Sequence, residues 1–194
     1  MDRKGQGVKA QAANLCEETE VRAGAKPCAN VEPVEHDNES LEERLVNLLA
    51  KRKMTITTAE SCTGGLIAGN LVNVVGASDV LNEGYVTYSN EAKQRLVGVS
   101  AKTLERFGAV SEQTAREMAE GAARAACADM ALSATGIAGP GGGTAEKPVG
   151  LVYIGCFANG ITRVKECRFK GNRRENREQT VKEALKLAVE MLER

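Results

Sequence analysis

Two segments of this sequence place polar, potentially reactive side chains directly after a predicted strand. In residues 54–65, the β-branched stretch 54–58 predicts a strand, and the following Ala-Glu-Ser-Cys-Thr-Gly-Gly predicts a tight turn. Residues 66–72 are apolar at helical spacing, so a helix should follow that turn. Residues 85–93 repeat this order of strand, polar turn and helix, with Lys93 in the first helical turn. Because such turns lie at the carboxyl edge of the sheet in open α/β folds, we interpret the two segments as parts of one active site.

These segments offer several ways to activate a nucleophile. His36 is the only histidine and lies in a polar stretch, so neither a Ser-His-Asp triad nor a histidine-bound metal is expected. Lys93 is a candidate base, because the helix dipole and partial burial would both lower its pKa; the alternative is a surface lysine on an amphipathic helix. Cys62, near a helix N-terminus, is either a thiolate or a buried, inert thiol. Ser61 and Ser78 are candidate hydroxyls, although Ser78 also fits a simple turn or cap. The residue pattern alone leaves the choice of nucleophile open.

Three further features could serve a ligand. Tyr88, at a predicted strand end, could relay a proton or could simply pack. The glycine-rich residues 136–143 would let the backbone approach a ligand, or would form a plain connector. This loop lacks the Lys-Ser/Thr ending of a P-loop, so a nucleotide triphosphate is not indicated. Residues 171–177 open the last predicted helix with three arginines, which favours a bound phosphate; the alternative is a solvated basic turn paired with Glu175 and Glu178.

Composition excludes several classes of protein. Twenty-six basic side chains balance 26 acidic ones, so no net field favours nucleic acid or an anionic membrane. The apolar runs are shorter than a membrane span, and from the composition of the first residues we expect no signal peptide. The six cysteines include no Cys-x-x-Cys pair, which favours reduced thiols and argues against a zinc site. We therefore expect a cytoplasmic protein that uses no metal and no cofactor.

The predicted domain organisation is simple. Residues 1–38 hold no aromatic and few large aliphatic side chains, so they should form a disordered polar extension. Residues 39–194 should form one domain, which begins with a helix capped by Ser40.

The predicted elements of this domain follow the order α-β-α-β-α-α-β-β-β-α. The second helix is expected to end near Val75, residues 79–83 to form a connection, and residues 84–88 to form the second strand. Asn159-Gly160, between two alternating runs, predicts a β-hairpin. The order indicates a three-layer α/β/α sandwich, whose mixed, mostly parallel sheet has about five strands and includes one antiparallel hairpin.

Five motifs of this chain occur together in one known family. They are residues 58–65, 84–93, 108–111, 135–143 and 147–150, in this order. With them the chain resembles the C-terminal domain of the competence/damage-inducible protein CinA, the nicotinamide mononucleotide (NMN) deamidase family. The resemblance covers about residues 41–192, nearly the whole predicted domain. One departure is Glu83, at a position where the family often has glycine.

The resemblance implies an activity and a set of site residues. The activity is metal-independent hydrolysis of the NMN carboxamide to nicotinic acid mononucleotide and ammonia. Separately, we expect the chain to form a homo-oligomer, a dimer. The implied catalytic residues are Ser78 as nucleophile, Lys93 as base and Tyr88. The implied substrate-binding residues are Ser61, Thr63, Thr135, Gly136 and Gly139, with Arg173 for the phosphate. A catalytically silent nucleotide-binding module of the same fold is the alternative.

Overall fold

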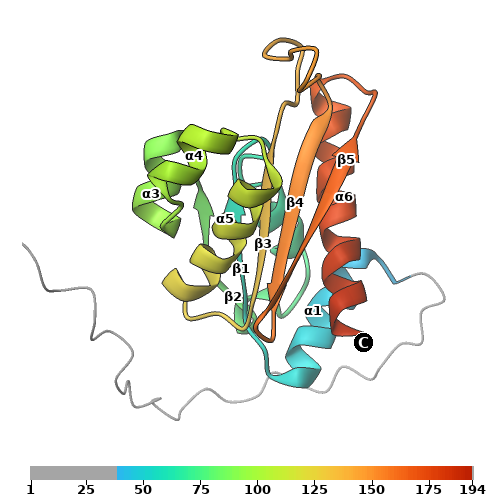
Figure 1. The fold of residues 1–194 in the computed structure, drawn as a ribbon. Helices are drawn as coiled ribbons and strands as arrows, with labels where there is room; N and C mark the ends of the chain where they lie inside the picture. Colours follow the sequence, from blue (N-terminus) through green and yellow to red (C-terminus); the bar gives the residue numbers. More distant parts are fainter. Residues whose placement is uncertain (1–38, 194) are drawn as a thin grey trace, which may run out of the picture. The chain divides into compact units, whose positions relative to one another are not determined.

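Five strands form one mixed sheet in the computed structural model, which describes residues 39–193 (Figure 1). The predicted extension, residues 1–38, lies outside the described residues. The order across the sheet is β2-β1-β3-β4-β5, where β1 pairs in parallel with β2 and β3 and the last two pairings are antiparallel. The strands are β1 (Ile56–Glu60), β2 (Leu81–Val86), β3 (Met130–Gly136), β4 (Leu151–Ala158) and β5 (Ile161–Arg168).

Helices cover both faces of this sheet, so the predicted three-layer α/β/α architecture is confirmed (Figure 1). One face carries α1 (Leu41–Arg52), α2 (Leu66–Leu71) and α6 (Arg173–Leu192). The other face carries α3 (Asn90–Val97), α4 (Ala101–Phe107) and the alanine-rich α5 (Glu112–Ala125). A short 3₁₀ helix, η1 (Ala77–Asp79), precedes β2.

β1 lies inside the sheet, and all five of its residues are buried. Because successive side chains of a strand point to opposite faces, β1 contributes to two cores. Ile56 packs in the larger core with α1, α2 and α6, and Ala59 packs in the smaller core with α3, α4 and α5. The turn that follows β1 is therefore carried by a strand fixed on both faces.

The hairpin prediction is confirmed, and two predicted boundaries are wrong by three residues or more. Asn159 and Gly160 both have positive φ, 51° and 75°, as a two-residue hairpin turn between β4 and β5 requires. The second helix ends at Leu71 instead of Val75. β2 begins at Leu81 instead of Gly84, because Leu81 pairs with Ile56 of β1. β2 is an edge strand with mostly exposed side chains, so its sequence carries no apolar alternation that would reveal its start.

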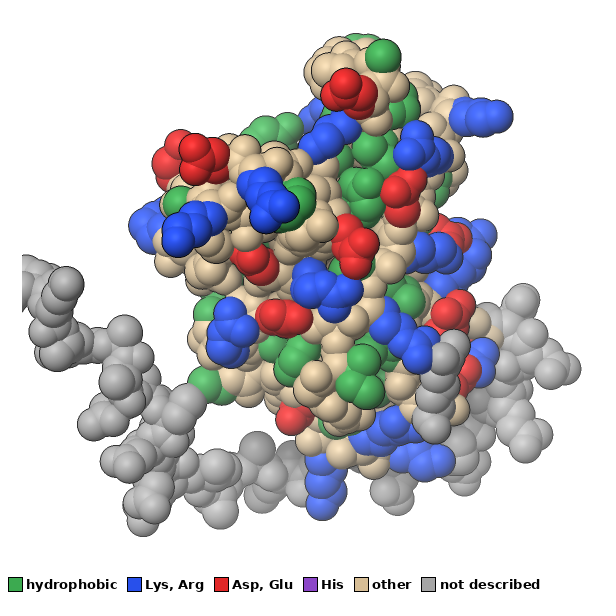
Figure 2. Space-filling view, in the orientation of Figure 1, with side chains coloured by type: hydrophobic (Ala, Val, Ile, Leu, Met, Phe, Trp, Pro, Cys, Tyr) green, Lys and Arg blue, Asp and Glu red, His purple; other side chains and the backbone are tan. Residues whose placement is uncertain are grey.

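The surface carries both signs of charge. Figure 2 shows basic and acidic side chains interspersed over the visible face, in keeping with the equal numbers in the whole chain. Among residues 39–193, no helix combines the length and the apolar character needed to cross a membrane.

Candidate active site

The turns after β1 and β2 meet at the carboxyl edge of the parallel strands, as predicted. The Ser61 N–H donates to the Ala134 carbonyl of β3 at 2.9 Å, and the Thr87 N–H donates to the Glu60 carbonyl of β1 at 2.8 Å. These bonds continue the sheet beyond the strand ends and hold the two turns beside each other. Open α/β sheets bind their ligands at this edge.

Lys93 reaches into this edge from the first turn of α3. Ser89 is the N-cap of this helix, and its hydroxyl accepts a hydrogen bond from the Ala92 N–H at 3.1 Å. The Lys93 side chain is only 1% exposed, and its Nζ donates to the Ser61 Oγ at 3.1 Å and to the Thr87 carbonyl at 2.9 Å. Burial lowers the pKa of Lys93. An amine with a lowered pKa beside a serine hydroxyl is the arrangement of a general base with its nucleophile.

The neighbouring thiol is unsuited to act as the nucleophile. Cys62 is buried, and this burial is the main cause that raises its pKa to about 12. The thiolate is the reactive form of cysteine, and at neutral pH this thiol therefore stays protonated. Of the two interpretations that the sequence left open, the structure favours a buried, inert Cys62.

A cavity of about 210 Å³ opens beside Ser61 and Lys93. Arg173, the first residue of α6, lies across it, with Nη1 donating to the Gly139 carbonyl at 2.9 Å and Nη2 donating to the Tyr88 hydroxyl at 3.2 Å. Six residues predicted for the site line this cavity, namely Ser61, Tyr88, Lys93, Thr135, Gly136 and Arg173, and the candidate thiol Cys62 lines it as well. Four other lining residues, Asn90, Ala109, Val110 and Ala138, lie within the family motifs but were not predicted as site residues. Three of these four have small apolar side chains, which give no chemical signal.

Three residues predicted for the site do not line the cavity, namely Ser78, Thr63 and Gly139. Within one chain, the nucleophile that the resemblance implies, Ser78, lies away from Lys93. Ser78 is exposed in η1, before the first residue of β2, whereas Tyr88 follows the last. The six residues of β2 span roughly 20 Å at about 3.3 Å per residue, so Ser78 lies at the opposite edge of the sheet from the cavity. Thr63 is fully buried within the turn. Within one chain, Ser61 is therefore the serine within reach of Lys93.

Part of the cavity wall is the loop between α4 and α5, whose backbone carbonyls accept hydrogen bonds from two side chains. The Thr135 hydroxyl donates to the Ala109 carbonyl at 2.6 Å. The Lys147 Nζ donates to the carbonyls of Phe107 and Val110, at 2.7 and 2.8 Å. Thr135 and Lys147 therefore hold the backbone on which Ala109 and Val110 line the cavity.

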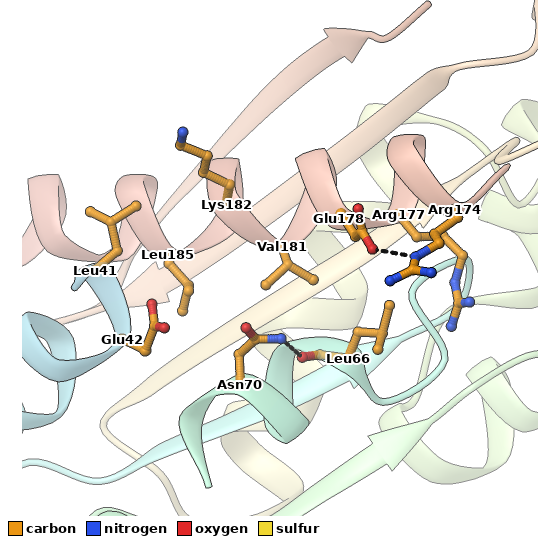
Figure 3. A pocket seen from close by; sticks show the side chains of 10 residues that line it. All are labelled: Leu41, Glu42, Leu66, Asn70, Arg174, Arg177, Glu178, Val181, Lys182 and Leu185. Carbon is orange, nitrogen blue, oxygen red and sulfur yellow. Dashed lines mark hydrogen bonds and ion pairs between the residues drawn. The ribbon is translucent and has the colours of Figure 1, made fainter. Parts of the chain in front are cut away.

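A larger groove of about 610 Å³ lies between α1, α2 and α6 (Figure 3). Leu66 and Asn70 of α2 face Val181 of α6 across it. On its rim Arg174 pairs with Glu178 at 2.7 Å. The groove is not lined by Ser61 or Lys93, so the smaller cavity is the candidate active site. In the described part of the chain, no group of three or more His, Cys, Asp and Glu side chains could hold a metal ion.

Residues 38–192 match the family model of the CinA C-terminal domain. A CinA-like protein of Kosmotoga olearia is 58% identical over 147 residues, which cover 76% of this chain and 36% of that protein. A putative competence-damage inducible protein of Clostridium perfringens is 56% identical over 146 residues, covering 75% of this chain and 35% of that protein. The chain thus spans about a third of the length of these curated relatives.

Solved structures agree with this match. The competence/damage inducible protein CihA of Agrobacterium tumefaciens superposes with a TM-score of 0.77 at 47% identity, covering 79% of this chain and 94% of that chain. A competence-damaged protein (CinA) superfamily protein of Enterobacter cloacae has the same TM-score at 35% identity, covering 84% of this chain and 99% of that chain.

Proposed function

This chain belongs to the CinA C-terminal domain family, and on that premise we propose that it hydrolyses the carboxamide of NMN to nicotinic acid mononucleotide and ammonia. The observation that carries the proposal is the 3.1 Å hydrogen bond between Lys93 Nζ and Ser61 Oγ, beside a cavity that Arg173 also lines. A base, a hydroxyl and a cationic group are what hydrolysis of a phosphate-bearing amide needs. The substrate is the one that the family resemblance implies.

The reaction would begin with the neutral form of Lys93. Its amine accepts the Ser61 proton while Oγ bonds to the carboxamide carbon, giving a tetrahedral intermediate. Backbone N–H groups of a glycine turn would stabilise the oxyanion, at roughly 3–4 kcal/mol per donor. The C–N bond then breaks as a proton reaches the departing nitrogen, which leaves as ammonia; the proton comes from the Lys93 ammonium directly, or from Tyr88, which Lys93 then reprotonates. Water next attacks the Ser61 ester while Lys93 takes one of its protons. Lys93 then returns that proton to Ser61 Oγ as the ester C–O bond breaks and nicotinic acid mononucleotide leaves.

Arg173 is the group we assign to the 5′-phosphate. The guanidinium has five N–H donors, and the two hydrogen bonds to Gly139 and Tyr88 use one each on Nη1 and Nη2. Donors therefore remain for a phosphate oxygen. Arg173 also begins α6, where the helix dipole favours an anion.

The choice of Ser61 over Ser78 rests on the geometry of a single chain. The family resemblance assigns the nucleophile to Ser78, which lies at the other edge of the sheet from Lys93. Only a second copy of the chain could bring Ser78 to this cavity, so a Ser78 nucleophile would require a shared site in the expected dimer.

Ammonia release from NMN by Ser61→Ala and Ser78→Ala tests the proposal. We expect release by the wild-type protein, a loss of at least about 10³-fold in Ser61→Ala, and near-normal activity in Ser78→Ala. Loss of activity in Ser78→Ala alone would refute Ser61 as the nucleophile. If mixing this inactive variant with Lys93→Ala then restored activity, the site would be shared between two chains. Binding of NMN without ammonia release by the wild type would instead identify a silent binding module.

A further inference from the structure

Arg177 of α6 contacts the backbone of the turn that carries Ser61. Its Nε donates to the Cys62 carbonyl at 3.1 Å, and its Nη2 donates to the Thr63 carbonyl at 2.7 Å. The contact joins residues 114 and 115 positions apart in the sequence. The two accepting carbonyls belong to the two residues that directly follow Ser61.

This turn needs support from outside, because regular secondary structure does not fix it. Gly64 and Gly65 have φ values of 61° and 96°, in the left-handed region. The Glu60 carboxyl group holds the end of the turn where α2 begins, because it accepts hydrogen bonds from the N–H groups of Gly65, Ile67 and Ala68 at 2.9–3.0 Å. Between Ser61 and these glycines, the Arg177 guanidinium is the side chain that holds the backbone. Because each peptide unit is planar, fixing two successive carbonyls fixes the orientation of both peptide planes.

We infer that Arg177 is a positioning residue for the reaction proposed above: it holds the Ser61 turn so that Oγ stays within hydrogen-bonding distance of Lys93 Nζ. The inference rests on the proposed function for its kinetic consequence. Arg177 does not line the cavity beside Ser61, but lines the separate groove between α1, α2 and α6, so it acts through the backbone and not on the substrate.

The three arginines at the start of α6 therefore have different tasks. Arg173 lies across the cavity, and Arg177 binds the two carbonyls of the turn. Arg174 is 86% exposed and turns toward Glu178 (Figure 3). Arg174 lies on the same helix as Arg177 and has the same side chain, but its hydrogen bond goes to Glu178 and not to the turn. Arg174→Ala is therefore the matched control.

Steady-state kinetics of Arg177→Ala and Arg177→Lys test the inference. A displacement of about 1 Å can cost roughly 10²-fold in rate, so we expect kcat of Arg177→Ala to fall about 10- to 100-fold, with KM within about threefold of the wild type. Lysine supplies a point charge in place of a planar fork, and Arg177→Lys should recover only part of the loss. Low concentrations of guanidinium ion should partly restore Arg177→Ala, and Arg174→Ala should match the wild type. An unchanged kcat in Arg177→Ala, or a change in KM alone, would overturn the inference.

A second readout needs no substrate and separates this inference from the proposed function. The rate at which a sulfonyl fluoride modifies Ser61, followed by mass spectrometry, should fall in Arg177→Ala but not in Arg174→Ala. Each variant is assayed well below its own melting temperature, and Arg177→Lys replaces Arg177→Ala if the latter does not fold. Slower labelling in a protein that never releases ammonia would support the positioning role and reject NMN hydrolysis. Equal labelling rates in an active protein would reject the positioning role alone.

Discussion

Replacing Lys93 with methionine should remove activity. It should also change the free energy of unfolding, relative to the wild type, by an amount that depends on pH. Methionine keeps an unbranched apolar stem in the buried site but loses the amine that reaches Ser61 Oγ. A general base contributes about 10²–10⁴-fold, so kcat/KM should fall by at least that factor. In the wild type, kcat/KM should rise with pH through the pKa of Lys93, which burial lowers, because only the neutral amine accepts a proton.

The same lowered pKa sets the sign of the stability effect. The unfolded chain binds the Lys93 proton more tightly than the folded one, so wild-type stability should rise with pH between the folded pKa and the unfolded value of about 10.4. The slope from this one group reaches about 1.36 kcal/mol per pH unit. Lys93→Met lacks the group, so its stability relative to the wild type should be greatest at low pH and should decrease as pH rises through that window.

Urea unfolding of both proteins between about pH 6 and pH 10, alongside wild-type kcat/KM, measures the two effects together. At its low-pH end, the stability difference should level off at the same pH as the midpoint of the kcat/KM profile, because both report the pKa of Lys93 in the free, folded protein. Lys165→Met is the control: the hydrogen bond from Lys165 to Glu183 raises the Lys165 pKa, so its stability difference should stay flat between about pH 6 and pH 9. A flat difference for Lys93→Met, or activity within tenfold of the wild type, would refute Lys93 as a base with a lowered pKa.

Arg173→Ala tests the phosphate contact, and Gly121→Ala, with Gly69→Ala as its control, tests the packing of α5 against α3. Arg173→Ala should raise KM for NMN about tenfold or more with little change in kcat, and nicotinamide riboside, which lacks the phosphate, should be a poor substrate for both proteins. Normal kinetics in that variant would place the phosphate elsewhere. Gly121→Ala should lower the free energy of unfolding, measured in urea, by about 1–3 kcal/mol or more, because its Cβ would lie 1.6 Å from the Val97 carbonyl oxygen. The Cβ of Gly69→Ala would have no atom within 4 Å, so this variant should gain about 0.5–1 kcal/mol in the free energy of unfolding. Equal losses in the two glycine variants would contradict the packing argument.

Local signals in the sequence were sufficient for the architecture. Strand, turn and helix patterns depend on neighbouring residues, so the order of elements, the Asn159-Gly160 turn and the cap at Ser40 follow from short stretches of chain. One of the boundaries that were predicted wrongly, the start of β2 at Leu81, depends on pairing with Ile56, which lies 25 positions earlier. Pairing of this kind recruits residues whose own pattern predicts a loop.

The sequence by itself determined which reactive groups are available and that Lys93 lies in the first turn of a helix at the carboxyl edge of the sheet. Only the tertiary structure decided which serine meets that amine. Ser78 is closer to Lys93 in the sequence than Ser61 is, but it precedes β2 while Lys93 follows it, and the length of the strand separates them. Ser61 meets Lys93 from 32 positions away because β1 and β2 run parallel and end at the same edge. The structure also decided which groups are buried, and so lowered the pKa of Lys93 and raised that of Cys62, because burial depends on all the elements that pack around a side chain and not on its neighbours in the sequence.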